Sequence, residues 1–416
     1  MRLLTIDTDL NRIRTARSAA RRTNLDKRAK LPLIIWVVLF FLVLACVVPG
    51  ALFGFNISGI SWVVPLIMSI YVIATRISMV TFPWKLWLPW ILMLIIHLLT
   101  LDYALLDQHV IPLQRTAQML SPLFVGMAIS TFRPTKATTT RFFSVLRYLA
   151  YVLVGLLVVT SGGNMRGFAS QNMALLLLCV FFANRYLLFR EKKDLQIWLV
   201  LACIPVLAIT RTVIAASLLT FPLALSPMSI ARRITFIVLM AAAGLAIFQL
   251  PAVQEKMFFS GHGELSEIGH SDDFATSGRS YMLELMYPEA ETKHWFGHGT
   301  GGGETMAWDI ARLAYPHDDW LLTYFDYGVV GVVILIACIL LTIYHGFKAQ
   351  RKCVSKETRL LFLTGLSAFV PFVLVMFTDN ILVYASFFGM LHYTFLGLGY
   401  GALKVEQDAK RIQRTS

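Results

Sequence analysis

Long apolar blocks alternate with short polar connectors along most of the chain. Two examples are LPLIIWVVLFFLVLACVVPG at 31–50 and RITFIVLMAAAGLAIFQL at 233–250, each close to the ~20 residues that an α-helix needs to cross a bilayer. Counting such blocks predicts about twelve transmembrane helices, which start near residues 31, 59, 86, 110, 142, 170, 195, 211, 233, 319, 360 and 380. The pattern therefore predicts an all-α, polytopic membrane protein.

Composition agrees with this prediction. Of the 416 residues, 57% are hydrophobic and 15% are charged, whereas about 25% of residues are charged in soluble domains. The first thirty residues carry nine Arg and Lys and no apolar core of the kind found in signal peptides, so we expect the N-terminus to stay in the cytoplasm. The five cysteines form no CxxC pair and no disulfide framework, which argues against redox chemistry.

The net charge of +13 is spread over the connectors and reports topology rather than nucleic-acid binding. If the N-terminus is cytoplasmic, every second connector must be cytoplasmic too, and each of these is basic. They contain Arg76 and Lys85, then Arg133, Lys136 and Arg141, then Arg190, Lys192 and Lys193, then Arg232 and Arg233, then Lys348, Arg351, Lys352, Lys356 and Arg359. The interval between the blocks at 195 and 211 could be a break in one long segment, but merging the two blocks would invert the charge pattern downstream.

The predicted organisation has five parts: a basic cytoplasmic tail at 1–30, helices one to nine at 31–250, a large outer loop at 251–316, helices ten to twelve at 317–403, and a cytoplasmic tail at 404–416. The loop is acidic, with ten Asp and Glu against four Lys and Arg. Loops of this length in compact domains are usually functional. Within it, RSYMLELMYPEA and GGETMAWDIARLAY have the pattern of short amphipathic helices.

Several arginines stand on the predicted outer side, where topological signals alone would not place them. They are Arg115, Arg166, Arg211, Arg279 and Arg312. The planar guanidinium binds phosphate through two hydrogen bonds and stays charged when partly desolvated. One interpretation is an anionic ligand at the outer membrane surface. The other is that each arginine snorkels at a helix end or pairs with an acid of the loop.

The segment PHDDWLLTYFDYG at 316–328 carries the most reactive side chain of the outer face. Pro316 suits a chain that enters a helix, and Asp318 and Asp319 suit its first turn, at the positive end of the helix dipole. Positions 317, 321, 324 and 328 would then share one helical face. Gly328 would then lie beneath the histidine and let a neighbouring helix approach closely. Asp326 falls on the opposite face, where we expect it to pair with another helix. His317 is the candidate general base.

Two other patterns in the loop are weaker. GHGTGGGE at 297–304 has backbone amides that could nest a phosphate, but it lacks the Gly-Lys-Ser/Thr ending of a P-loop. His294 and His298 have the i, i+4 spacing of zinc ligands and would need His317 and Asp318 to complete a site, but a Phe-Gly pair interrupts the helix between them. We therefore predict neither a metal nor a cofactor.

The segment HDDWLLTYFDYG resembles the H-[NS]-x-x-L-x6-G signature of the O-antigen ligase and O-antigen polymerase superfamily, with His317, Leu321 and Gly328 in register. Three more stretches resemble motifs of this family and occur in the same order. RGFASQNMA contains Arg166 and Asn172, LAITRTVIAA contains Arg211, and SGRSYMLELM followed by HWFGHGTGGG contains Arg279. Two departures are Asp318, where the family has Asn or Ser, and Thr210, where it has Ser.

The resemblance, which covers residues 140–400, implies a fold and an activity. It implies a glycosyltransferase-C-like enzyme of the bacterial inner membrane that takes a glycan from undecaprenyl pyrophosphate on the periplasmic side, without a metal and with inversion. Arg211 and Arg279 would stabilise the pyrophosphate leaving group, and His317 would accept a proton from the acceptor hydroxyl or position a substrate. The residues implied in substrate binding are Arg115, Arg166, Asn172 and Asp318.

Three functions stay open. A polymerase of O-antigen or exopolysaccharide would join one lipid-linked repeat to another, and a ligase of lipopolysaccharide biosynthesis would join the polymer to lipid A core. We favour the polymerase slightly, because no stretch marks a site for lipid A core. A non-enzymatic transporter of lipid-linked glycans would need polar residues near mid-membrane in several helices, for which His97, Asp326 and His392 are the main candidates.

Overall fold

The computed structural model describes residues 30–47, 51–52, 55–56, 61–101, 110–161, 171–268, 273–275, 279–313 and 316–415. These residues are almost entirely helical, which confirms the predicted all-α class. Two very short strands, β1 (Ala51–Leu52) and β2 (Phe55–Asn56), form one antiparallel pair.

Helices lie at the predicted apolar blocks. In the first half of the chain they are α2 (Leu33–Val47), α4 (Val63–Arg76), α5 (Trp87–Leu99), α6 (Val110–Ser130), α7 (Lys136–Ser161), α8 (Gln171–Phe189), α9 (Lys192–Leu207) and α10 (Arg211–Leu219), with the 3-10 turns η1 (Ile77–Met79) and η2 (Trp84–Leu86) before α5. In the second half they are α11 (Ile230–Phe248), α15 (Asp319–Gln350), α16 (Lys356–Ser367), α17 (Phe369–Met376), the π-helical turn η7 (Ala385–Gly389) and α18 (Met390–Thr415).

Five of these helices are long and apolar enough to cross a membrane: 136–159 of α7, 172–189 of α8, all of α11, all of α15, and α16 with α17 together. The chain is therefore a multi-pass membrane protein. Helix α10 is separate from α9 but has nine residues, or about 14 Å, which is shorter than a bilayer core of about 30 Å. The count of twelve spans and the sidedness of the loop stay predictions.

Burial follows the expected membrane arrangement. Helix α8 is mostly buried inside the bundle, whereas the apolar window of α11 contains no buried residue, as is expected of a lipid-facing helix. Helices α6 and α18 cross so closely that a Cβ at Gly397 would lie 2.3 Å from the carbonyl oxygen of Gly126. Small residues at such crossings let membrane helices pack backbone to backbone.

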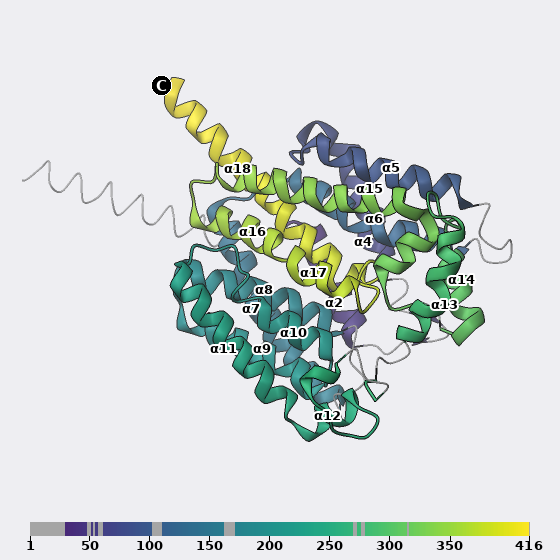
Figure 1. Ribbon diagram of the computed structural model, residues 1–416. Helices are drawn as coiled ribbons and strands as arrows, with labels where there is room; N and C mark the ends of the chain where they lie inside the picture. Colours follow the sequence, from purple (N-terminus) through teal and green to yellow (C-terminus); the bar gives the residue numbers. More distant parts are fainter. Residues whose placement is uncertain are drawn as a thin grey trace, which may run out of the picture.

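The predicted outer loop folds against one end of the bundle. It contains α12 (Pro251–Met257), the 3-10 turn η6 (Leu265–Glu267), α13 (Arg279–Thr292) and α14 (Gly302–Ala311), so both predicted amphipathic stretches are helices. Helices α13 and α14 lie at one end, and α18 leaves with the C-terminus at the other (Figure 1). We call these the loop end and the basic end.

Contacts of α8 and α9 agree with this division. At the basic end, Arg185 near the C-terminus of α8 forms an ion pair of 2.8 Å with Asp194 at the start of α9. At the loop end, Asn172 at the start of α8 donates to Thr210 Oγ1 at 2.9 Å. Lys256 of α12 donates to the carbonyl oxygen of Ile209 at 2.7 Å. The turn before Arg211 is thus held at the loop end.

Candidate active site

His317 lies at the loop end, two residues before α15 begins. Its backbone has φ +54°, a left-handed conformation that costs a residue with a side chain about 1–3 kcal/mol. The strained backbone is held by its N–H, which donates to Asn380 Oδ1 at 3.0 Å. Helix α15 begins at Asp319, where the span was predicted to start, but the predicted helical face does not include position 317, because this turn places the imidazole ahead of the helix, where the side chain is 43% exposed.

Asp379 faces the imidazole. Its Oδ1 lies 3.4 Å from His317 Nδ1 and also accepts from the N–H of Asn380 at 2.8 Å and from the hydroxyl of Tyr384 at 3.1 Å. A carboxylate at one ring nitrogen orients an imidazole and selects the tautomer in which the other nitrogen accepts a proton. The arrangement therefore leaves Nε2 of His317 as the proton acceptor.

Asp319 ties the turn that carries Asp379 to the start of α15. Its buried carboxylate accepts from Asn380 Nδ2 at 3.2 Å and from the N–H of Leu382 at 3.0 Å. The turn between α17 and η7 is therefore joined by buried hydrogen bonds to the segment that carries His317. These bonds hold the two partners of the His–Asp pair in register.

Asp318 is the N-cap of α15. Its Oδ1 accepts from the N–H groups of Trp320 and Leu321, each at 2.9 Å. Burial raises the pKa of Asp318, and these two hydrogen bonds oppose the shift. Asn, Ser and Asp are all favoured N-caps, so the departure from the family pattern preserves the cap. The predicted contact of Asp318 with a substrate stays a prediction.

Arg279 brings a cation to the same place. It is the first residue of α13, and its charge interacts with those of Asp379 and Asp318. Burial lowers the pKa of its guanidinium, and the two carboxylates oppose that shift. Its Nε is buried and has no hydrogen-bond partner among the described residues. This N–H is a donor available to an oxygen of a ligand.

Arg211 reaches the loop from the start of α10. Its Nη1 donates to the carbonyl oxygen of Ala275 at 2.6 Å, and its guanidinium lies over the ring of Phe274, 5.8 Å from the centroid. It is close enough to Arg279 for their like charges to interact. Two partly buried like charges repel each other, so an anion bound beside both would be stabilised.

Asn172 lies next to the turn that carries Arg211 and not beside His317. Its side chain is fully buried, and it donates a hydrogen bond to Thr210, the N-cap residue before α10. Its Oδ1 is buried without a hydrogen-bond partner among the described residues. Arg166, which is also predicted to bind substrate, lies outside the described residues.

Arg115 of α6 is 5% exposed and sits among acids. Its Nη1 donates to Asp326 Oδ2 at 2.9 Å and lies 3.1 Å from Glu304 Oε1. Burial raises the pKa of Glu304 to about 7, an effect that Arg115 opposes. The expected pairing of Asp326 with another helix is confirmed. Arg115 is thus paired with Glu304, an acid of the loop, as in the second interpretation of the outer arginines. Its direct contact with a substrate stays a prediction.

Helix α15 is interrupted at Gly328, which has φ +62° and ψ −161°. The loop segment 294–299 fills the interruption. His298 and Gly299 donate to the carbonyl oxygens of Phe325 and Asp326 at 2.8 and 2.9 Å, and Val329 and Val330 donate to the loop carbonyl oxygens of His294 and Trp295 at 2.9 and 3.2 Å. The expectation that a neighbouring helix packs on Gly328 is therefore wrong, because the backbone of the loop packs there.

The glycine-rich stretch at 297–304 binds a carboxylate of the protein. The N–H groups of Gly301 and Gly303 donate to Asp326 at 3.3 and 2.7 Å. Its amides are thus used by the same buried acid that pairs with Arg115. This stretch anchors the loop on the transmembrane helices.

The loop histidines have separate partners. His294 Nδ1 lies 2.6 Å from the hydroxyl of Tyr324, and His298 Nε2 lies 2.9 Å from the carbonyl oxygen of Glu289. The ring of His298 stacks on Phe325, with 4.5 Å between centroids. Among the described residues, no group of three or more His, Cys, Asp or Glu is arranged to hold a metal ion.

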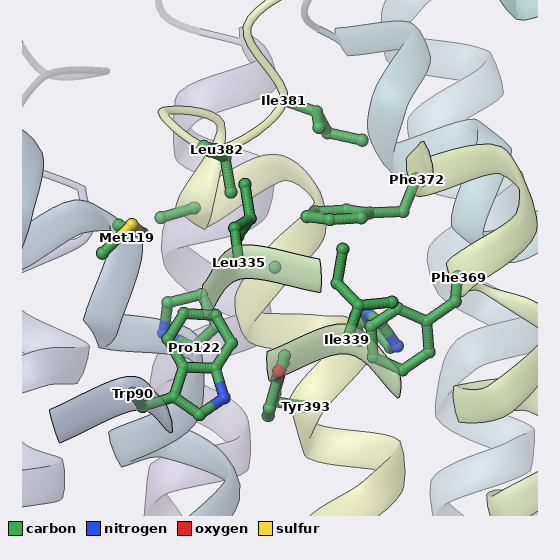
Figure 2. A pocket seen from close by; sticks show the side chains of 13 residues that line it. Trp90, Met119, Pro122, Leu335, Ile339, Phe369, Phe372, Ile381, Leu382 and Tyr393 are labelled. Atoms are coloured by element: carbon green, nitrogen blue, oxygen red, sulfur yellow. The ribbon is translucent and has the colours of Figure 1, made fainter. Parts of the chain in front are cut away.

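An apolar cavity lies beneath the turn that carries Asp379. Ile381 and Leu382 form its upper side, Phe372 of α17 lies beside them, and Trp90 and Tyr393 lie at its lower side (Figure 2). Its free volume is about 20 Å³, which is room for roughly one water molecule. The cavity is too small for a lipid chain in this arrangement.

Residues 196–336 match the family model described as O-antigen ligase. This stretch of the chain is similar to the O-antigen ligase domain. It contains Arg211, Arg279 and His317 and ends before Asp379. The resemblance to the O-antigen ligase and polymerase superfamily is thereby confirmed over these residues. A comparison with curated proteins finds no match.

Asp379, Asn380 and Tyr384 are the site residues that sequence reasoning missed. A signal for them exists, because TDN at 378–380 is a polar triplet between two apolar blocks. The charge alternation of the connectors puts that triplet on the same side as His317.

Proposed function

We propose that this O-antigen ligase family protein is a periplasm-facing glycosyltransferase that moves a glycan from undecaprenyl pyrophosphate to a sugar hydroxyl. The observation that supports this proposal most is the convergence of His317, Asp379, Arg279 and Arg211 at the loop end. A base next to two arginines is what displacement of a pyrophosphate requires.

In the proposed reaction, the acceptor hydroxyl oxygen attacks the anomeric carbon of the donor. The bond from that carbon to the pyrophosphate oxygen breaks, and the new glycosidic bond forms on the opposite face, so the configuration inverts. His317 Nε2 takes the proton of the hydroxyl, and Asp379 at Nδ1 stabilises the imidazolium that results.

The two arginines take the charge of the leaving group. The pyrophosphate gains negative charge as the bond breaks, and fixed donors aimed at such charge lower the barrier. Arg279 offers its unpartnered Nε, and Arg211 offers a guanidinium that repels Arg279 until an anion lies between them. The proposal gives this charge stabilisation to the two arginines and routes no step through a metal ion.

The acceptor is proposed to be a second lipid-linked repeat, which makes the protein a polymerase of O-antigen or exopolysaccharide. Ligation to lipid A core uses the same chemistry, since only the hydroxyl donor differs. The geometry around His317 serves both. The distinction therefore depends on the products in the cell.

The test is complementation of a deletion strain with wild type, His317→Ala or His262→Ala, with the membrane level of each protein measured. His262 is an exposed histidine of the same loop whose hydrogen bonds, within the described part of the chain, stay in its own turn, so it is the matched control. We expect wild type and His262→Ala to restore the surface polysaccharide and His317→Ala to leave it absent.

The glycan profile of the deletion strain then separates the acceptors. Glycans that stop at one repeat on their normal anchor identify a polymerase. Full-length chains on undecaprenyl pyrophosphate together with bare lipid A core identify a ligase. A normal profile in cells that carry only His317→Ala would overturn the catalytic assignment and favour a transporter.

A further inference from the structure

A second cavity, with a polar lining, lies at the basic end of the bundle, far from His317. It has a volume of about 410 Å³ and lies between the end of α15, the middle of α18 and the connector before η2. Along α15 it is about 40 Å from the start of the helix at the 1.5 Å rise per residue. It has no role in the transfer reaction proposed above.

The cavity is lined by matching faces of two helices. Helix α15 contributes His345, Lys348 and Lys352, and α18 contributes Tyr400, Lys404 and Gln407. Both sets follow the i, i+3, i+4, i+7 spacing of one helical face. The polar residues thus line one shared hollow, in which Lys348, Lys352 and Gln407 are exposed to solvent and Tyr400 is buried.

The lining is cationic. No Asp or Glu is among the described residues that line the cavity. Lys404 forms an ion pair of 2.8 Å with Asp408 one turn further along α18. Lys348 and Lys352 form no ion pair with a carboxylate in the described part of the chain. The cavity therefore holds at least two uncompensated positive charges close together.

Tyr400 provides an independent observation. It is 6% exposed, and its hydroxyl is buried without a hydrogen-bond partner among the described residues. Its ring is fixed between Phe82 and Phe362, with centroids 4.9 and 5.0 Å away. A buried hydroxyl without a partner is unfavourable, and an acceptor at the floor of the cavity would satisfy it.

We propose that this cavity binds a phosphate group, and that its position favours the headgroup of an anionic phospholipid as the source. A phosphate oxygen could accept from Lys348, Lys352 and Tyr400 together, while Thr81 and Gln407 offer polar contacts to a glycerol headgroup. The cavity opens at the end where the helices carry their basic connectors, and basic pockets at that level bind anionic headgroups. If the basic residues served only to set the membrane topology, they would require neither a cavity nor a buried tyrosine hydroxyl beside it.

The experiment measures binding to the purified full-length protein in a zwitterionic detergent. The probes are dihexanoyl phosphatidylglycerol, dihexanoyl phosphatidylcholine and inorganic phosphate. The variants are Lys348→Gln with Lys352→Gln, and Tyr400→Phe. The charge-matched control is Arg351→Gln with Lys410→Gln, which removes two exposed cations from the same end but outside the cavity.

We expect phosphatidylglycerol to bind most tightly, the double lysine variant to bind it about 30-fold more weakly, and Tyr400→Phe about tenfold more weakly. The control should keep wild-type affinity. Inorganic phosphate that binds as tightly as phosphatidylglycerol would overturn the lipid as the source. Equal loss in the lysine variant and the control, or equal binding of phosphatidylcholine, would overturn the site itself.

Discussion

Replacing Gly328 by alanine tests whether the interruption of α15 positions His317. Its φ of +62° and ψ of −161° lie in a region almost restricted to glycine, where another residue costs about 1–3 kcal/mol. An added Cβ would also lie 2.4 Å from the carbonyl carbon of Trp295 and 2.5 Å from the carbonyl oxygen of His294. Because both contacts are backbone atoms, the loop must move away.

That movement breaks hydrogen bonds across the interruption. The bonds from Val329 and Val330 to the loop carbonyl oxygens are the nearest, and losing both adds about 2 kcal/mol. The total cost is about 3–5 kcal/mol. Since residues 319–327 connect the interruption directly to His317, the imidazole shifts as well, and a shift of about 1 Å costs about 100-fold in rate.

The assay is glycan transfer from a purified lipid-linked donor, measured together with thermal unfolding of the detergent-solubilised protein. We expect Gly328→Ala to lower both the unfolding midpoint and the rate. Gly155→Ala is the control, because a Cβ there meets nothing within 4 Å and alanine favours the α7 helix by up to about 1 kcal/mol. A Gly328→Ala protein with the midpoint and rate of wild type would refute the reasoning.

Three further predictions follow from the site. Asp379→Asn should lower kcat by about 10²–10⁴-fold with little change in KM, because the imidazolium of His317 loses its charge partner; an unchanged kcat in the same transfer assay would remove Asp379 from the mechanism. Arg279→Lys should lower kcat at least tenfold, because lysine keeps the charge but loses the planar fork that binds phosphate, and a wild-type rate would show that charge alone suffices. The pKa of Glu304 is raised from 4.5 to about 7 by burial, so the folded protein takes up a proton and stability falls as pH rises from 4.5 to 7. Glu304→Gln should therefore unfold at a higher temperature than wild type at pH 8, and thermal melts from pH 5 to 8 check this; a lower midpoint at pH 8 would mean that the charge of Glu304 is needed beside Arg115.

Periodicity and charge predicted the elements well because each depends on local sequence. The apolar blocks, the amphipathic stretches that became α13 and α14, and the separate segments at 195 and 211 could all be read from spacing. The interruption at Gly328 could not, because a glycine in a helical pattern looks the same whether a helix or a loop packs on it. The interruption is filled by the backbone of the loop segment 294–299, about thirty residues earlier in the chain. The local sequence around Gly328 does not encode where that segment lies.

The site shows the same division. The arginines and His317 were found because charge is conspicuous on an apolar background. Which of them contacts a ligand depends on partners distant in sequence, and for this reason Arg115 could not be told from Arg279. Arg115 meets two buried carboxylates, whereas Arg279 keeps a buried donor without a partner.

The length of α15 gives a depth for the site. The helix has 32 residues, about 48 Å, whereas the hydrocarbon core is about 30 Å thick. The part after the interruption, 329–350, is about 33 Å long and ends among basic residues, so it alone can span the bilayer. Residues 319–327 would then stand outside the hydrocarbon and carry His317 to the level of the lipid headgroups.

The aromatic residues at the interruption test this depth. Trp295 and Phe296 are 63% and 71% exposed, and exposed aromatic side chains of membrane proteins gather at the headgroup level. The emission of Trp295 is the difference between the tryptophan fluorescence of wild type and that of Trp295→Phe. In vesicles of brominated lipids, we expect bromine near the headgroups to quench this emission more strongly than bromine at the ends of the acyl chains. The reverse order would place the interruption in mid-bilayer. His317 would then be too deep to receive a polar acceptor from the aqueous side, and the donor and acceptor could not meet at this histidine.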